Sequence, residues 1–417
     1  MLRWNLLILL WAALPAASQE AASPRKTLTL EDALALAEQY NPRLKAAAAF
    51  IDGAEAGILT ARAYQNPDVS LGGFGGQRSH MAGAPSGFIG GWAVNQPLEL
   101  PSLRRARVRT AELGRETGRF ALAETRLTVR AGVMQAFYDT LRRKGEVELA
   151  HDNLQLLEDL ERRVGVQVKV GEAARLELVR AEAEVATARI QLESGRLRLK
   201  TARAALHAAI GAPNGVEFDP RDSLHPPVPL PALDVLRRQV LGAHPSVALA
   251  DNELRRADSR LALERELLKP QPSVWADMFR QPDVTQYRAG VTLPIPLWNK
   301  RQGPIAEAVA AQRQTAAIAD MRRLEIQAAL EAAYGQYEVA SQQVTMFEAG
   351  TLKEAEAAVS AAEAAFRFGE RGILEVLDAQ RVLRGARLEY LNAQFDRESA
   401  LIALEQLGAI EPRSKKP

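Results

Sequence analysis

The feature that most constrains the fold is the distribution of proline. The chain has 417 residues and 22 prolines, but none lies between residues 102 and 212 or between 305 and 411. Proline inside a helix removes a hydrogen bond and clashes with the preceding turn. Apolar residues recur in both stretches at three- and four-residue spacing, which is typical of a coiled-coil seam. Both stretches are therefore predicted to be long helices.

One glycine interrupts each stretch. A tight turn between two helices needs a residue that tolerates positive φ, and Gly171 and Gly369 stand at these points. We therefore expect two helical hairpins, 102–211 with its tip near 171 and 305–408 with its tip near 369. The arm 102–168 would be about 100 Å long at 1.5 Å per residue, too long for an ordinary compact bundle.

The sequence also repeats itself. Four pairs of similar segments recur in the same order at offsets of 197 to 205 residues. This order predicts two tandem repeats, 19–212 and 232–411, joined by a proline-rich irregular linker at 213–231. A polar tail follows at 412–417. The paired segments are 29–42 with 232–245, 67–69 with 272–274, 94–108 with 291–305, and 170–182 with 368–380.

Each repeat begins with short helices and continues into strand-like segments. A helix is expected to end before Asn41-Pro42 and before His244-Pro245, because the residue preceding proline disfavours the helical region. Apolar side chains then alternate with a period of two. The four predicted strands are 67–76, 86–98, 272–280 and 286–296, the last two segments lying in the second repeat.

Four strands are too few to close a membrane barrel, since the smallest such barrels have eight. The strands therefore form either a small soluble sheet or one part of a barrel built by several chains. Residues 1–18 favour export: Arg3 precedes an apolar run from Leu6 to Leu14, and small residues follow up to Ser18. This pattern predicts a secretory signal peptide cleaved after Ser18.

Composition excludes several classes of function. There is no cysteine, so disulfides, thiolate metal sites and a lipid anchor on cysteine are excluded. The net charge of +2 argues against a nucleic-acid binder. No histidine pair has metal-ligand spacing, the glycine-rich stretch 72–77 opens no helix, and no catalytic triad is evident. We therefore expect no enzyme activity, no cofactor and no resident metal.

The chain resembles the TolC-like outer-membrane efflux proteins over essentially its whole mature length. The repeat, the order of strand pair and long hairpin, and the tip segments VGEAARLELVRAE (170–182) and FGERGILEVLDAQ (368–380) carry the resemblance. The segments 96–112 and 293–308 look most like the branch that serves cobalt–zinc–cadmium and copper–silver efflux pumps.

The resemblance implies a mainly α protein with a membrane β-barrel part. Three chains would form a homotrimer, with a twelve-stranded barrel in outer-membrane lipid and an α-helical tunnel in the periplasm of a Gram-negative bacterium. The tunnel would meet a periplasmic adaptor (membrane fusion) protein and an inner-membrane pump of the resistance-nodulation-division type. The expected cargo is heavy-metal cations such as cobalt, zinc or cadmium.

The resemblance also implies a periplasmic gate near the second tip. Glu375 and Asp378 match the acidic residues at the narrowest point, and their spacing of three puts both on one helix face. Rings of carboxylates attract cations. The other matched positions are Phe366 and Arg371, which tie hairpins together, Glu177 as an acidic partner, Arg180 as the repeat counterpart of Asp378, and Gly171 and Gly369 for docking the adaptor.

Three alternatives remain open from the residues. From their spacing alone, the charges near the tip are equally those of a solvated coiled-coil flank. The same duct is also compatible with export of drugs or with type I polypeptide secretion. A soluble periplasmic coiled-coil adaptor would need the strands to form only a small sheet.

Overall fold

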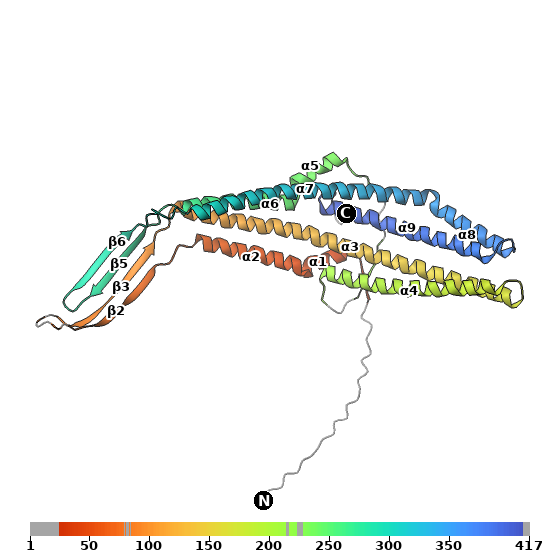
Figure 1. The fold of residues 1–417 in the computed structure, drawn as a ribbon, viewed down its shortest axis with the longest axis horizontal. Helices are drawn as coiled ribbons and strands as arrows, with labels where there is room; N and C mark the ends of the chain where they lie inside the picture. Colours follow the sequence, from red (N-terminus) through yellow and green to blue (C-terminus); the bar gives the residue numbers. More distant parts are fainter. Residues whose placement is uncertain are drawn as a thin grey trace, which may run out of the picture.

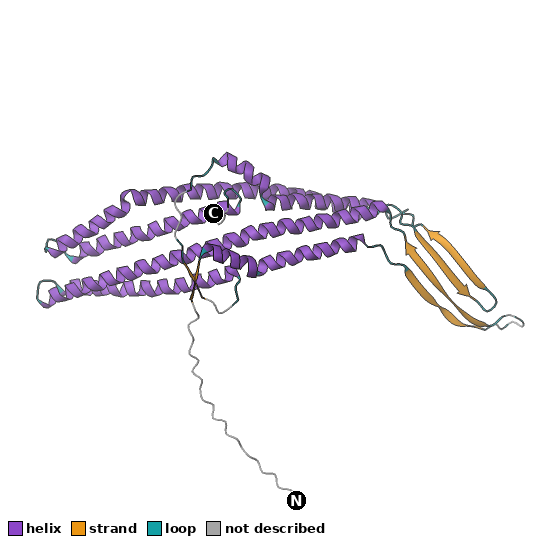
Figure 2. Ribbon diagram, turned by 180° about the vertical axis from the view of Figure 1, so that it is seen from behind, coloured by secondary structure: helices purple, strands orange, loops and turns teal. Residues whose placement is uncertain are grey.

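The protein is an elongated helical body with a β-sheet at one end (Figure 1). The computed structural model describes residues 25–411, except 79, 81, 82, 84, 214–216 and 223–227. The predicted signal peptide, the tail 412–417 and parts of the linker lie outside the described residues. The helices run roughly parallel to the long axis, and the sheet continues beyond their common end (Figure 2). The prediction of a mainly α chain is confirmed.

The first hairpin contains α3 (Pro101–Lys169) and α4 (Arg175–Ile210). Pro101 occupies the first helical position of α3, where its missing N–H costs nothing. The helix is then uninterrupted for 69 residues. Gly211 ends α4 in the left-handed conformation with a φ of 72°, which glycine adopts without a steric penalty.

The second hairpin is interrupted, unlike the prediction of a single break at glycine 369. Its first arm contains α7 (Gln302–Met346), a π-helical segment η1 (Phe347–Thr351) and α8 (Leu352–Arg367), and its second arm is α9 (Ile373–Gln406). Gly350 leaves the helical region there, with φ and ψ of 174° and −29°. A π segment accommodates an extra residue in a helix, a change that the apolar spacing did not reveal.

Four shorter helices complete the body: α1 (Leu30–Tyr40), α2 (Pro42–Arg62), α5 (Leu233–Ala243) and α6 (Pro245–Glu266). Helix α2 packs along α3, and α6 packs against both α3 and α7. Asn41 and His244 are extended residues that separate each pair, as expected before proline. Their side chains cap α2 and α6, respectively.

The sheet is antiparallel, with the order β2 (Asp68–Gln77), β3 (Gly87–Pro97), β5 (Ser273–Arg280) and β6 (Thr285–Thr292). The predicted strand 286–296 is too long at its end. Residues 293–296 lie outside β6, because Pro294 and Pro296 cannot donate hydrogen bonds to a ladder.

The register places most apolar side chains on one face of the sheet and most polar ones on the other, where Trp275 and Phe279 also lie. One cross-strand row joins Leu71, Trp92, Met278 and Tyr287. The next row, on the opposite face, joins Ser70, Ala93, Asp277 and Arg288, and Arg288 forms an ion pair with Asp277 at 2.9 Å. Residues directly opposite one another project from the same face, so the sheet is amphipathic.

A second, two-stranded sheet was not predicted. Strand β1 (Arg25–Leu28) pairs in parallel with β4 (Glu217–Pro220), which lies inside the linker that was expected to be irregular. Leu28 and Phe218 are both buried in the core beneath it. Burial of these two side chains overrides the proline-rich composition of the surrounding linker.

The helical body contains its own core, whereas the sheet exposes most of its apolar side chains. One cluster is centred on Phe137 and Tyr138 of α3, and a second on Leu330 of α7 and Leu401 of α9. In contrast, every residue of β2 is exposed. Within the described part of the chain, no helix combines the length and the hydropathy needed to cross a membrane.

Candidate functional site at the hairpin tips

The two hairpin tips lie side by side at the end of the body farthest from the sheet (Figures 1 and 2). Both tips use the same turn. The φ of Gly171 is 84° and that of Gly369 is 73°. Glu172 N donates to Gln167 O at 2.8 Å, and Glu370 N donates to Ala365 O at 2.9 Å. These are the bonds of a Schellman motif, which satisfies carbonyls at a helix end.

An apolar cluster packs the second tip against the first hairpin. It contains side chains from α3, α4 and α9: Leu157, Leu160, Val164, Ala181, Val185, Ala188, Ile373, Val376 and Leu377. Phe366 of α8 is partly buried against this cluster. Phe366 therefore ties α8 to its neighbours within one chain, by apolar packing.

Acidic side chains from both hairpins meet beside Gly372. A Cβ atom at this glycine would lie 3.7 Å from Glu177 Oε1 and 3.8 Å from Glu375 Oε2. The two carboxylates therefore face the same point, one from α4 and one from α9. The guanidinium of Arg371 lies 3.8 Å from Glu375 Oε1, which balances part of the negative charge.

Asp378 lies one turn farther along α9 and is 72% exposed. Its nearest cation is Arg381, at 3.8 Å. Arg381 also bonds Glu184 of α4 at 2.7 Å, and Arg384 donates to Gln191 of α4 at 2.9 Å. The sequence analysis missed these contacts between hairpins. The charge three residues after Asp378 was visible, but its partner depends on the register between α4 and α9.

The structure does not bring Arg180 to an acidic partner. The side chain is exposed, and among the described residues of one chain no ion pair of Arg180 is within 4.0 Å. The expected contact between Arg180 and an acid of the gate is therefore absent from the single chain. Glu177, not Arg180, lies beside the second tip.

A groove of about 700 Å³ lies behind the tips between α3 and α8. Phe366 and Val376 line it together with polar residues of α3, including Asp159 and Arg163. The tip region thus presents exposed carboxylates on α9 beside this groove. Within the described residues, no group of three histidine, aspartate or glutamate side chains is arranged to hold a metal ion.

Comparison with known proteins assigns the fold and its relatives. Residues 33–212 and 236–409 both match the family described as Outer membrane efflux protein. The chain is 29% identical over 397 residues to the cobalt-zinc-cadmium resistance protein CzcC of Cupriavidus metallidurans, covering 94% of this chain and 92% of that protein.

Two further proteins agree with this match. The nickel-cobalt-cadmium resistance protein NccC of Alcaligenes xylosoxydans xylosoxydans is 27% identical over 330 residues, covering 76% of this chain and 71% of that protein. A crystal structure of CusC, described as forming a transmembrane channel, superposes with a TM-score of 0.78 at 17% identity, with 91% of each chain covered. The family matches cover most of the chain, and the family consists of efflux ducts rather than enzymes. The chain therefore belongs to the outer membrane efflux protein family, with the TolC-like fold.

Proposed function

We propose that the protein is the outer-membrane exit duct of a system that exports heavy-metal cations. The observation that carries the membrane part is the amphipathic sheet. Leu71, Trp92, Met278 and Tyr287 form an apolar row, whereas the opposite face holds the Asp277–Arg288 ion pair. A barrel wall in a membrane has this arrangement, with apolar side chains toward lipid and polar ones toward the lumen.

Three chains would complete the barrel. The sheet has two open edges, β2 and β6, and open edges are not tolerated in lipid. If β2 of one chain pairs with β6 of the next, three copies give twelve strands and leave no edge. The helical bodies then lie side by side as a tunnel whose far end is formed by the hairpin tips.

The tips would form the gate and the docking point for a periplasmic adaptor. Glu375 and Asp378 are exposed on α9, and Glu177 faces Glu375 across Gly372. Repetition of these carboxylates in a trimer would surround a narrow lumen with negative charge, which favours passage of cations. Arg371 and Phe366 would hold the second tip, and Gly171 and Gly369 would shape the turns that the adaptor contacts.

The names of the relatives support the proposed cargo. CzcC and NccC are named for resistance to divalent metals, which supports cobalt, zinc, cadmium or nickel as substrate. An inner-membrane pump of the resistance-nodulation-division type would supply the energy. The two family matches, at 33–212 and 236–409, support a tandem repeat, and residues 1–18 would act as the export signal.

The test is growth of a strain from which the gene has been deleted, with and without the intact gene restored. The panel contains zinc, cobalt, cadmium, nickel, copper and silver salts, dyes, detergents and antibiotics. We expect sensitivity confined to metals and reversed by the restored gene. Sensitivity to dyes and antibiotics alone would refute metal export and leave a drug duct. Recovery of the protein from cells without detergent would refute the membrane location and favour the soluble adaptor.

A further inference from the structure

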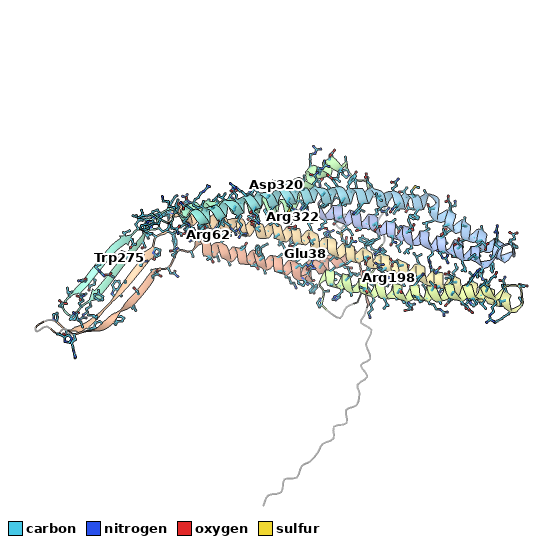
Figure 3. All side chains as sticks on the ribbon, viewed as in Figure 1. Glu38, Arg62, Arg198, Trp275, Asp320 and Arg322 are labelled. Atoms are coloured by element: carbon cyan, nitrogen blue, oxygen red, sulfur yellow. The ribbon has the colours of Figure 1, made fainter. Side chains whose placement is uncertain are left out.

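A second charged region lies at the opposite end of the helical body, where the sheet begins. A cavity of about 430 Å³ is enclosed there by the end of α2, the start of α3 and the segments that lead to the strands. Four arginines line it: Arg62, Arg104, Arg105 and Arg109. Figure 3 labels Arg62 at this junction.

The carboxylates near the cavity are already paired. Glu99 lies 2.7 Å from Arg107, which is outside the cavity lining, and its side chain is only 3% exposed. Glu112 lies 3.6 Å from Arg62. Arg104, Arg105 and Arg109 have no carboxylate within 4.0 Å among the described residues, and Glu266 of α6 attracts Arg105 from a longer distance while it pairs with Lys269. The cavity therefore carries an excess of positive charge.

Arg104 is held by several contacts, whereas Arg105 and Arg109 are more exposed. The Arg104 guanidinium donates to the Arg62 carbonyl oxygen at 2.7 Å and lies 4.4 Å from the centre of the Tyr64 ring. Arg105 and Arg109 are exposed, and Arg105 Nε donates to Pro101 O at 3.3 Å. A fixed guanidinium with two exposed ones beside it suits a phosphate group, since guanidinium donates pairs of hydrogen bonds to phosphate oxygens.

Apolar side chains are also exposed on the segments that join the strands to the long helices. Leu98 is exposed just before α3, and Leu297 and Trp298 are exposed between β6 and α7, Trp298 to 91%. Exposed tryptophan at the base of a membrane sheet is typical of the boundary between lipid and water. The end of the body next to the sheet thus carries both the arginine cavity and exposed apolar side chains on the connecting segments, as expected at lipid headgroups.

We propose that this arginine cavity binds the phosphate of an anionic phospholipid in the periplasmic leaflet of the outer membrane. The inference rests on the proposed function, because it requires the sheet to stand in a membrane. Each basic residue near an anionic lipid surface strengthens binding about fivefold. Loss of two arginines therefore weakens binding about 25-fold. Bound lipid would fix the depth of the sheet in the membrane.

The test measures binding of fluorescent phosphatidylglycerol to the full-length protein in micelles of an uncharged detergent. The variant Arg105→Gln with Arg109→Gln removes the two exposed charges and leaves Arg104 and its contacts in place. The matched control, Arg198→Gln with Arg313→Gln, removes two exposed arginines from α4 and α7. Arg109→Gln alone is a second variant, and the melting temperature of each protein verifies the fold.

We expect the cavity variant to bind phosphatidylglycerol about 25-fold more weakly, Arg109→Gln about fivefold more weakly, and the control to bind like the original chain. Equal loss in the control and the cavity variant would overturn the proposal, because it would indicate a diffuse charge effect. Displacement of the lipid by inorganic phosphate at equal concentration would also overturn it and would indicate a site for free phosphate.

Failure of the proposed function gives a different result. In that case the original chain and all variants alike fail to insert into vesicles of phosphatidylcholine with phosphatidylglycerol. If the function holds and only the lipid site is wrong, all proteins insert and their phosphatidylglycerol affinities are the same.

Discussion

The joint between α1 and α2 and the joint between α5 and α6 are built differently. At the first joint, Asn41 Oδ1 accepts from Arg43 N at 2.9 Å, and its Nδ2 donates to Ala209 O near the end of α4 at 2.8 Å. At the second joint, His244 Nδ1 accepts from Ser246 N at 3.1 Å, and its ring hydrogen-bonds the backbone of Gln406 near the end of α9. Both side chains thus cap the following helix and bond the end of a long helix. At the first joint the group is an amide, and at the second it is a titratable ring.

The packing around the first joint is also tighter than the packing around the second. A Cβ atom at Gly211 would lie only 2.7 Å from Pro42, and β1 and β4 cover the first joint with buried Leu28 and Phe218. At Gly408, near the second joint, a Cβ atom would meet nothing within 4 Å. The second hairpin also contains the π segment η1. The first half of the chain is therefore the better-braced frame, and the adjustable features belong to the second half.

The largest expected effect on this comparison comes from Asn41→Ala. The change removes a helix cap and leaves the Ala209 carbonyl without its donor, at a combined cost of about 2 kcal/mol in the free energy of unfolding. Thermal unfolding of the purified protein measures it. Asn41→Ser is the control, since it retains a capping oxygen and should lose about half as much. Equal stability of the original chain and Asn41→Ala would show that the first joint does not brace the frame.

A charge swap at the tips tests whether the acidic function belongs to the second hairpin. In Asp378→Arg we expect block of single-channel current by multivalent cations to weaken about tenfold, because in the proposed trimer three carboxylates would become three cations. The matched change Arg180→Asp alters the first hairpin, and should change block less than about twofold because Arg180 lies away from the acids. Equal effects of the two changes would contradict a gate whose main acidic residues, Glu375 and Asp378, belong to the second hairpin.

The contribution of the second joint to stability should depend on pH, whereas that of the first joint should not. Burial lowers the pKa of His244 below its usual value, although the Gln406 backbone and Glu124 oppose this and Arg322 adds to it. Glu325 of α7 and Ser246 also line this site. Because the unfolded chain binds the proton more readily, His244 lowers stability as pH falls from about 6.5 toward its lower folded pKa.

His244→Asn copies the first joint onto the second and should remove part of this acid sensitivity. The measurement is the fall in melting temperature between pH 7.5 and pH 5.5. We expect this fall to be a few degrees smaller in the variant, which corresponds to a change on the order of 1 kcal/mol in the free energy of unfolding. At pH 7.5 the two proteins should differ little. An unchanged fall in melting temperature would show that other groups cause the acid response.

The smallest expected effect is at the π segment. The Tyr390 hydroxyl of α9 donates to Glu348 Oε1 of η1 at 2.9 Å, and the Tyr390 ring meets Phe347 edge to face. Tyr390→Phe removes the hydrogen bond and retains the ring, at a cost of about 0.5–1 kcal/mol in thermal unfolding. Glu348→Gln retains an acceptor and should cost less. A loss above about 2 kcal/mol would show that this contact holds the second hairpin together more than a single hydrogen bond does.

The sequence predicts those parts of the fold that depend on neighbouring residues. Long proline-free stretches with coiled-coil spacing correspond to helices α3, α4, α7 and α9, because interior proline and helical spacing act within a few residues. The segment η1 was not predicted, since a π segment changes the spacing by a single residue. Strands β1 and β4 were missed as well, because their pairing depends on the core that Leu28 and Phe218 enter.

The sequence likewise predicts only those features of the candidate site that depend on neighbouring residues. Helix spacing brought Glu375 and Asp378 to one face, and the resemblance to the efflux family supplied their role. The meeting of Glu177 with Glu375, and of Arg381 with Glu184, depends on how two hairpins align. No local pattern encodes that alignment, so Arg381 was missed and Arg180 was expected to have a partner that one chain does not provide.

The most direct test of metal export is the rate at which cells release metal. Cells lacking the gene, with and without the intact gene restored, are loaded with zinc, cobalt or cadmium and transferred to metal-free medium. Metal retained in the cells is then measured by mass spectrometry over time. We predict faster loss of at least one of these metals when the gene is restored, with no change in the release of a fluorescent dye. Equal metal retention in both strains, with faster dye release in the restored strain, would contradict the account.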